Sequence, residues 1–292
     1  MQRVDPQAFP WRVERSSPRA KIPTMQASPI PSRLPTFSMA YQPIVNIDRL
    51  DVFAYEALVR SHNNKEDARG VLDCVPPTSA YAFDLACRSH ALRLAIELDI
   101  QQSDAKLCLN INPTAATQDA SHLGLTCTEA IASGMALDRL IMELAEEEEI
   151  KDPVSLRVIL AEYQRMGIKI ALDDFGSGYA GLKLLAILQP DLIKLDISLV
   201  SRVATERPTE IILSAIVSAC FDLGVAVVAE GVENYEVSMR MREMGVTLQQ
   251  GYYFSRPAFE QLPTINWHGA MSSSSSKLAT KLGSRRGLRT VS

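Results

Sequence analysis

Two aspartates stand side by side in the stretch "KIALDDFGSGYAGLKLLA", residues 169–186, where an apolar run gives way to a glycine-rich turn. Asp173 and Asp174 would repel each other unless a cation lay beside them. Carboxylate oxygens are the ligands that hard cations such as Mg²⁺ and Mn²⁺ prefer. One aspartate can bridge two such ions while its neighbour binds the second ion alone. The pair therefore predicts a site for two divalent cations.

Polar residues follow most of the other apolar runs of the chain in the same way. They are Glu56 after "VFAY", Asn110 after "KLCL", Glu143 after "RLIM", Lys194 after "LI", Glu230 after "AVVA" and Gln250 in the last run. Any one of these acids is as well explained by a helix cap or a solvated turn, but the whole series is not. Two metal ions roughly 3.5–4 Å apart stabilise the attacking and the leaving oxygen when a phosphodiester is hydrolysed. The pattern therefore predicts metal-dependent phosphodiester hydrolysis, with Gly176 and Gly178 allowing a tight loop over the site.

Eight strand-like runs carry these residues, and most of them are separated by segments of helical length and period. The runs are residues 37–45, 52–60, 106–113, 139–146, 169–176, 192–200, 226–233 and 248–257, and the helical segments include 80–98, 154–166, 209–223 and 235–244. Only the first two runs are joined by a short link, "NIDRLD", which predicts a hairpin and hence one antiparallel strand near the N-terminus.

This alternation predicts an α/β fold with a mostly parallel sheet, and eight strands in about 230 residues suit a TIM-type (β/α)8 barrel. A doubly wound open sheet is the alternative. In a barrel the carboxyl ends of the strands converge on one face, which would bring the polar residues together.

Composition excludes several other classes of protein and site. No apolar run reaches the 18 residues of a membrane span and the N-terminus has no signal-like apolar region, so we expect a cytoplasmic protein. The five cysteines form no CxxC pair and the four histidines form no HxH or HExxH pair. Disulfides and a histidine or cysteine metal site are therefore not expected, and any metal must be bound by oxygen.

The net charge of −4 hides an uneven distribution along the chain. Residues 1–36 carry six basic and two acidic groups, and residues 265–292 carry five basic and none acidic, which leaves −13 on residues 37–264. So acidic a segment would repel a phosphate substrate unless divalent cations reversed the local field. The flanking segments are rich in Pro, Ser, Lys and Arg and lack periodicity, so we predict two disordered basic tails around one domain at residues 37–264. We assign the tails no function and do not expect a nucleic acid partner.

The stretch "YEALVR" at residues 55–60 resembles the name-giving motif of EAL domains, a family of bacterial cyclic-di-GMP phosphodiesterases. The likeness continues in family order through "YQPIV", "NIN", "MELAE", "LDDFGSGYAGL", "DLIKLD", "VVAEGVE" and "QGYYFSRP", and covers roughly residues 37–262. The stretches "FDLACR" and "YAGLKLLA" look most like the EAL halves of blue-light-sensing BLUF proteins. No flavin-binding module would fit in the short N-terminal segment, so we expect a stand-alone EAL domain.

The resemblance implies hydrolysis of cyclic-di-GMP to linear 5'-pGpG, which would lower the level of this second messenger. It also implies two Mg²⁺ or Mn²⁺ ions as cofactors, inhibition by Ca²⁺, and a homodimer. The first ion would be held by Glu56, Asn110, Glu143 and Asp173, and the second by Asp173, Asp174 and Glu230. The catalytic group would be Lys194, Glu230, Gln250 and Asp174, in which Lys194 orients or helps to deprotonate the attacking water and Gln250 supports water and substrate. Substrate would contact Gln42 and Arg60, and the acids that brace the glycine-rich loop would be Glu146 and Glu233.

The chain departs from the family pattern at three positions near that loop. Ala145 stands where many members have threonine, and Ala180 and Gly181 replace the usual pair of serines after Tyr179. Loss of these hydroxyls predicts looser bracing of the loop or an altered helix start, and hence lower activity.

Two other functions stay open. One is a catalytically idle EAL domain that senses cyclic-di-GMP or binds a regulatory protein. The other is a metal-dependent barrel that acts on a different phosphodiester, because a fold by itself does not specify a substrate. The presence of every proposed ligand favours the enzyme.

Overall fold

The computed structural model describes residues 34–113, 121–146, 150, 152–178, 180–265 and 267. Most of the two predicted tails, 1–36 and 265–292, therefore lies outside the described residues, as does Tyr179. The domain boundaries at 37 and 264 stay a prediction.

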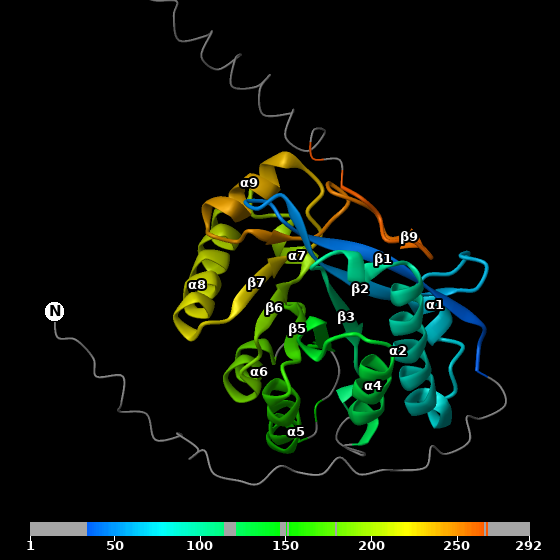
Figure 1. Ribbon diagram of the computed structural model, residues 1–292. Coiled ribbons are helices and arrows are strands. Elements are labelled where there is room, and N and C mark those ends of the chain that lie inside the picture. The colour runs from blue at the N-terminus through cyan, green and yellow to red at the C-terminus, as the bar shows by residue number, and fades with distance from the viewer. Residues whose placement is uncertain are drawn as a thin grey trace, which may run out of the picture.

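The described strands form one closed sheet of nine strands, in the order β2-β3-β4-β5-β6-β7-β8-β1-β9, with β1 also paired to β2 (Figure 1). The strands are β1 (Phe37–Asn46), β2 (Asp51–Ser61), β3 (Lys106–Asn110), β4 (Leu140–Ala145), β5 (Lys169–Phe175), β6 (Leu192–Leu195), β7 (Ala226–Ala229), β8 (Leu248–Gln249) and β9 (Ala258–Phe259). Strands β2 to β8 run parallel to one another, whereas β1 is antiparallel to both β2 and β8. The predicted barrel with one antiparallel strand near the N-terminus is confirmed, and the open-sheet alternative is wrong because the β1–β2 pairing closes the sheet.

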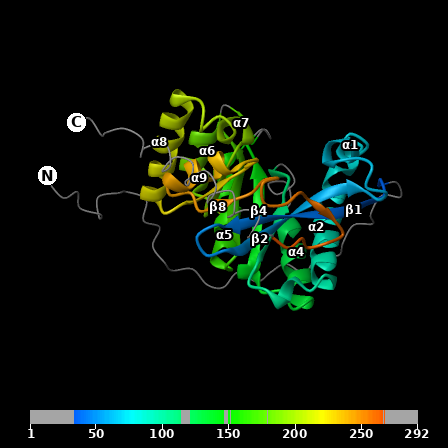
Figure 2. The same cartoon turned by 90° about the horizontal axis from the view of Figure 1, so that it is seen from above.

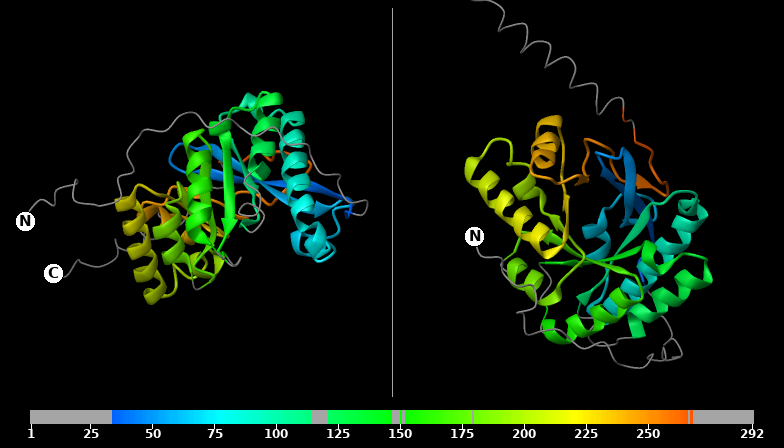
Figure 3. Two further views of the ribbon diagram at one scale, coloured as in Figure 1. Left: turned by 90° about the horizontal axis from the view of Figure 1, so that it is seen from below. Right: turned by 60° about the vertical axis from the view of Figure 1, so that its left-hand side comes forward.

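Helices cover the outside of this barrel, as the further views in Figures 2 and 3 show. The α-helices are α1 (Ala68–Leu72), α2 (Ala80–Glu97), α4 (Ser121–Ala132), α5 (Pro153–Arg165), α6 (Gly181–Leu188), α7 (Ile197–Val200), α8 (Arg207–Leu223) and α9 (Tyr235–Glu243), and short 3-10 turns are η1 (Pro77–Ser79), η2 (Ile100–Gln102) and η3 (Leu137–Arg139). All four helical segments expected from the sequence are present within one or two residues at either end. Among the described residues, no helix has the length and apolar character needed to cross a bilayer.

Several of the predicted strands are shorter than the sequence suggested, and the runs 106–113 and 226–233 are strands only in Lys106–Asn110 and Ala226–Ala229. The run 192–200 is a strand only as far as Leu195, because Asp196 caps the short helix α7 by accepting a hydrogen bond from the Ser198 amide at 2.9 Å. The run 248–257 is a strand only in Leu248–Gln249. At Gly251 the chain turns with φ of +158°, and a Cβ there would lie 2.1 Å from the Val232 carbonyl oxygen, so only glycine allows this close approach.

Strand β2 is one residue longer at either end than the predicted run 52–60, and it carries Glu56 near its middle. Its pairing with β3 ends at Glu56, opposite Cys108, whereas its pairing with β1 continues to Ser61 opposite Phe37. The β1–β2 hairpin therefore extends beyond the barrel. Glu56 lies in the middle of its strand but still at the rim where the barrel ends.

The barrel interior has an apolar floor below that rim. One buried cluster takes one residue from each of the first seven strands: Ile44, Ala54, Cys108, Ile141, Ala171, Leu192 and Val228. A second and larger cluster fills the space between the strands and the surrounding helices. The floor matters for function because side chains alternate along a strand, so the residue two positions further on points into the barrel as well.

Candidate metal centre

A layer of polar side chains lies directly above the apolar floor, two residues along each strand. Its members are Gln42, Glu56, Asn110, Glu143, Asp173 and Lys194, together with Glu230 just after β7 and Gln250 just after β8. The period of two explains why residues from eight different places in the sequence point into one space. All the residues proposed as metal ligands other than Asp174 belong to this layer.

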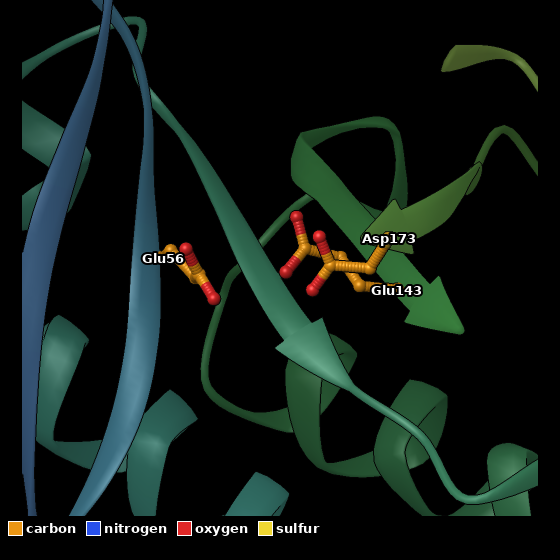
Figure 4. A group of neighbouring side chains, drawn as sticks. All are labelled: Glu56, Glu143 and Asp173. Carbon is orange, nitrogen blue, oxygen red and sulfur yellow. The ribbon is translucent and has the colours of Figure 1, made fainter. Parts of the chain in front are cut away.

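Lys194 lies in the middle of the layer and is 1% exposed. Its Nζ is 2.8 Å from Glu230 Oε1, 2.9 Å from Asp173 Oδ1, 3.2 Å from Glu56 Oε2 and 3.4 Å from Glu143 Oε2. Figure 4 shows Glu56, Glu143 and Asp173 reaching toward one another from β2, β4 and β5. One ammonium group therefore contacts four buried or half-buried carboxylates.

The carboxylates form two groups in which one ligand oxygen from each residue lies within 4.8 Å of the others. The first is Glu56, Glu143 and Asp173, and the second is Asp173, Asp174 and Glu230. Asp173 belongs to both, which is the arrangement expected of an acid that bridges two cations. Asn110 is exposed and is the strand partner of Glu143 across the β3–β4 ladder, so its amide lies at the edge of the first group.

The donor set suits hard cations. Every group is a carboxylate or an amide oxygen, which matches the preference of Mg²⁺ and Mn²⁺. Glu143 is fully buried, and among the described residues its Oε1 has no hydrogen-bond partner. Since buried polar atoms are nearly always paired, this orphaned oxygen points to a bound cation.

A bulge in β5 explains how two adjacent aspartates reach the same place. Neighbouring residues of a regular strand point to opposite faces. Here the β5–β6 register shifts between Leu172 and Phe175, and Asp174 adopts a left-handed φ of 52°. This bend brings the Asp174 carboxylate round to the side that Asp173 faces, and the Asp174 amide donates to Asp173 Oδ1 at 3.0 Å.

Burial and the charge of Lys194 act in opposite directions on the pKa values of the acids around it. Burial raises the pKa of Glu143 and of Glu230, although the nearby Lys194 ammonium opposes it. Burial and the Asp173 carboxylate raise the pKa of Asp174 to about 6. For Lys194 burial lowers the pKa, but the surrounding carboxylates outweigh it and hold the pKa well above its usual value. Lys194 is therefore a cation, and the cluster still has more acids than this one charge can balance.

Two glutamines close one side of the cluster. Gln250 Nε2 donates to Glu56 Oε2 at 2.7 Å and to Gln42 Oε1 at 3.3 Å, and Gln42 Nε2 donates to the Ser255 carbonyl at 3.2 Å. Gln250 Oε1 is buried, and among the described residues nothing donates to it. This oxygen is free to accept a hydrogen bond from a water or a substrate hydroxyl.

A cavity of about 240 Å³ opens beside these glutamines, and its lining includes Gln42, Glu56, Glu230 and Gln250. It also includes Tyr252, which is 50% exposed and whose ring lies 4.0 Å from the Arg256 guanidinium carbon. Tyr252 has no role among the sequence predictions, although an aromatic residue two positions after the strand-end Gln250 was a usable signal. Another cavity, of about 280 Å³, lies between α8 and α9, where the carboxylates are already paired with arginines.

Glu146 holds the glycine-rich loop through three backbone amides. Its Oε2 accepts from the Gly176 amide at 2.7 Å, and its Oε1 accepts from the amides of Gly181 at 2.7 Å and Ala180 at 3.1 Å. Ala180 is the N-cap of α6 and has no side chain that could cap it. At this helix start the Glu146 carboxylate therefore accepts the backbone hydrogen bonds that a serine side chain would otherwise accept.

Two other predicted residues are not brought into contact with the cluster. Arg60 lies four residues beyond Glu56 on the extended part of β2, where its Nη1 donates to the Val59 carbonyl at 2.8 Å. Glu233 is exposed and lines the cavity, and within the described part of the chain its side chain makes no hydrogen bond. Their roles in substrate contact and loop bracing stay predictions.

Comparison with known proteins identifies the family to which this sequence is similar. The sequence profile of the EAL domain matches residues 29–257. BluF of Escherichia coli K12, a blue light- and temperature-regulated antirepressor, is 28% identical over 228 residues, which cover 78% of this chain and 56% of BluF. Other matched proteins carry the name cyclic di-GMP phosphodiesterase.

Solved structures agree. A standalone versatile EAL protein from Vibrio cholerae O395 in a c-di-GMP-bound form is 35% identical, with a TM-score of 0.77 over 82% of this chain and 99% of that one. Klebsiella pneumoniae BlrP1 with manganese and cyclic di-GMP is 33% identical, with a TM-score of 0.72 over 79% of this chain and 57% of BlrP1, and BlrP1 also has a calcium complex. The predicted likeness to BLUF-type EAL proteins is confirmed. The chain spans little more than half the length of BluF and of BlrP1.

Proposed function

Since the chain belongs to the EAL domain family, whose members include cyclic-di-GMP phosphodiesterases, we propose that it hydrolyses cyclic-di-GMP to linear 5'-pGpG. The observation that carries this proposal is the pair of carboxylate groups that share Asp173 around the buried Lys194. An idle relative would be expected to lack one or more of these groups. Here Asn110, Lys194, Gln250 and all the proposed acids are present, and the strands that carry them end at one rim of the barrel.

Two Mg²⁺ or Mn²⁺ ions belong to the proposal. Glu56, Asn110, Glu143 and Asp173 would hold the first, and Asp173, Asp174 and Glu230 would hold the second. When bound, such ions stabilise the negative charge of the attacking and leaving oxygens. Ca²⁺ is larger and tolerates looser coordination, so it would occupy the same carboxylates without supporting the reaction.

The chain's own residues would orient the water and the substrate. Lys194, whose Nζ lies within 3.4 Å of four carboxylates, would orient the attacking water or help to deprotonate it. It can hold the attacking water through an N–H and stabilise charge that develops on the phosphate. Gln250 presents a free acceptor oxygen beside it, which fixes the water's orientation. Gln42 and Arg60 would contact the substrate from the β1–β2 hairpin.

Glu146 would keep the loop after Asp174 in place, with Glu233 as the second bracing acid. A homodimer completes the proposal, and one feature that supports it is Leu182, which is 70% exposed in the first turn of α6, directly after the loop. A contact there would reach the loop and, through Glu146, the metal site.

A second function is favoured by one observation, the likeness to the antirepressor BluF. In that case the chain would bind cyclic-di-GMP or a protein partner without hydrolysing the dinucleotide. The two functions differ in a measurable way, because a sensor binds the dinucleotide and leaves it intact.

The deciding experiment incubates the purified protein with cyclic-di-GMP and Mn²⁺ or Mg²⁺ and follows product by chromatography, with binding measured separately by calorimetry. We expect pGpG to form. Glu56→Ala should lose both metal binding and rate. If the unaltered protein binds cyclic-di-GMP but forms no pGpG, the enzyme function is refuted in favour of the sensor function.

A further inference from the structure

A second group of buried charges lies outside the acidic cluster, in the "FDLACR" stretch of α2. Asp84 and Arg88 stand one helical turn apart and form an ion pair, and the Arg88 side chain is only 1% exposed. Arg88 Nε also donates to Thr126 Oγ1 on α4 at 3.1 Å. The pair therefore lies inside the interface of two neighbouring helices, where it is far more buried than a surface ion pair.

The same pair reaches the backbone that follows the predicted metal ligand Asn110. The second oxygen of Asp84, Oδ1, accepts a hydrogen bond from the Asn112 amide at 3.3 Å. On the other side of this segment the Ile111 amide donates to the Glu143 carbonyl at 2.9 Å. The end of β3 is thus held by β4 on one side and by α2 on the other, and Figure 1 shows α2 and α4 packed beside β3.

Stability alone does not explain such a pair. Taking two charges out of water costs about as much as their attraction returns, so apolar residues of the same volume usually stabilise a fold equally well. What an apolar pair would not supply is an acceptor for the Asn112 amide. The carboxylate of Asp84 supplies it, and the ion pair with Arg88 fixes the direction of that carboxylate.

We propose that the Asp84–Arg88 pair is a positioning device that holds the end of β3 so that the Asn110 amide oxygen faces the first metal site. This rests on the proposed function in one respect, the assignment of Asn110 as a ligand. Removal of a group that orients a metal ligand without itself binding the metal typically weakens metal affinity about 10- to 100-fold. We expect the lower end of that range, because one ligand of four is displaced.

Two double variants separate the acceptor from the charges. Asp84→Asn with Arg88→Met removes both charges but keeps an oxygen that can accept from Asn112. Asp84→Leu with Arg88→Met removes the charges and the acceptor together. Neither leaves Asp84 or Arg88 charged without the other, so both should fold, which thermal unfolding in EDTA checks.

The readout is Mn²⁺ affinity without substrate, measured by electron paramagnetic resonance of the free ion. The Asn variant should bind Mn²⁺ within about threefold of the unaltered protein, and the Leu variant about tenfold more weakly. A control for disturbance of the same two helices is Glu129→Gln, because among the described residues Glu129 links α4 to Ser89 and Arg93 on α2 rather than to Asp84, Arg88 or the segment after β3. It should leave Mn²⁺ affinity unchanged.

A double-mutant cycle tests whether the pair acts through Asn110. In an Asn110→Ala background the Leu variant should cause no further loss of Mn²⁺ affinity, because the ligand it positions is already gone. Equal affinity of the Asn and Leu variants, or full additivity with Asn110→Ala, would overturn the proposal. An unaltered protein that binds Mn²⁺ but does not hydrolyse cyclic-di-GMP would refute the proposed function and leave this inference standing. A protein that binds no Mn²⁺ refutes both.

Discussion

Replacement of Lys194 by methionine should lower both the stability of the metal-free protein and its activity, and Mn²⁺ should restore the stability but not the activity. Methionine is close to lysine in length and keeps the apolar packing of the stem, but it removes the ammonium that lies 2.8–3.4 Å from four carboxylates. In the absence of metal, these acids then face one another without any cation. The consequence depends on whether divalent cations are present, which makes the test specific.

The size of the effect follows from the burial of the partners. Removing one member of a buried ion pair costs about 3–5 kcal/mol. The loss stays near the lower value here, because the buried carboxyls of Glu143 and Glu230 already have raised pKa values and can take up a proton. A loss of about 3 kcal/mol in the free energy of unfolding lowers Tm by about 6–12 °C for a domain of this size.

The sign of the pH dependence can also be stated. A carboxyl whose pKa is higher in the folded than in the unfolded state destabilises the fold as pH rises, because the folded state then has to give up a proton that it retains more strongly. In the unaltered protein the Lys194 ammonium opposes the rise of the pKa of Glu143 and Glu230, so these pKa values are higher still in Lys194→Met. The Tm difference between the variant and the unaltered protein in EDTA should therefore be larger at pH 8 than at pH 6.

Differential scanning fluorimetry in EDTA and in Mn²⁺, next to a chromatographic assay for pGpG, measures both consequences. Mn²⁺ should raise the Tm of the variant more than that of the unaltered protein, since the ions neutralise the same acids and bind only the folded state. Activity in Mn²⁺ should nevertheless fall of order 10²-fold, with little change in substrate affinity.

Lys169→Met is the matched control. Lys169 also pairs with an aspartate on the barrel, Asp191, at 2.7 Å, but its side chain is 45% exposed. Such a pair contributes about 0–1 kcal/mol, so the control should change Tm by no more than about 4 °C and should keep its activity. If Lys194→Met is as stable as the control in EDTA, or hydrolyses cyclic-di-GMP at the unaltered rate, the role given to Lys194 is wrong.

Other outcomes follow from the same structure. EDTA should abolish hydrolysis, Mn²⁺ or Mg²⁺ should restore it and Ca²⁺ should inhibit it; full activity in metal-free buffer would contradict the two-cation site. A chain shortened to residues 37–267 should keep its specific activity, because every proposed ligand lies between Gln42 and Gln250; a folded but inactive product would mean that the flanking segments take part. Glu146→Gln should lower kcat about tenfold and stability by about 1–3 kcal/mol, because an amide nitrogen would then face backbone donors; an unchanged kcat would show that the loop needs no brace. Gly251→Ala should lower Tm and disturb Gln250, because its Cβ would meet the Val232 carbonyl; a normal Tm would contradict that contact.

Local pattern was enough to predict the barrel and most of its rim. Apolar runs of strand length alternate with helical segments, and one short link marks the hairpin, so the element order leaves few topologies. Polar residues two positions beyond the floor residues follow from the period of a strand, which is visible in sequence. That is why the acids, Asn110 and Gln250 could be placed on one face without coordinates.

Contacts across the barrel were decided only by the tertiary structure. No local pattern indicated that Lys194 lies between four carboxylates, because such distances depend on the stagger and tilt of strands that are far apart in the chain. Nor did it show that β5 bulges at Asp174, or that Asp84 supports the end of β3 from a helix. A pattern along one chain segment reports which way a side chain points, whereas its partners come from other segments, and only packing of the whole barrel brings those together.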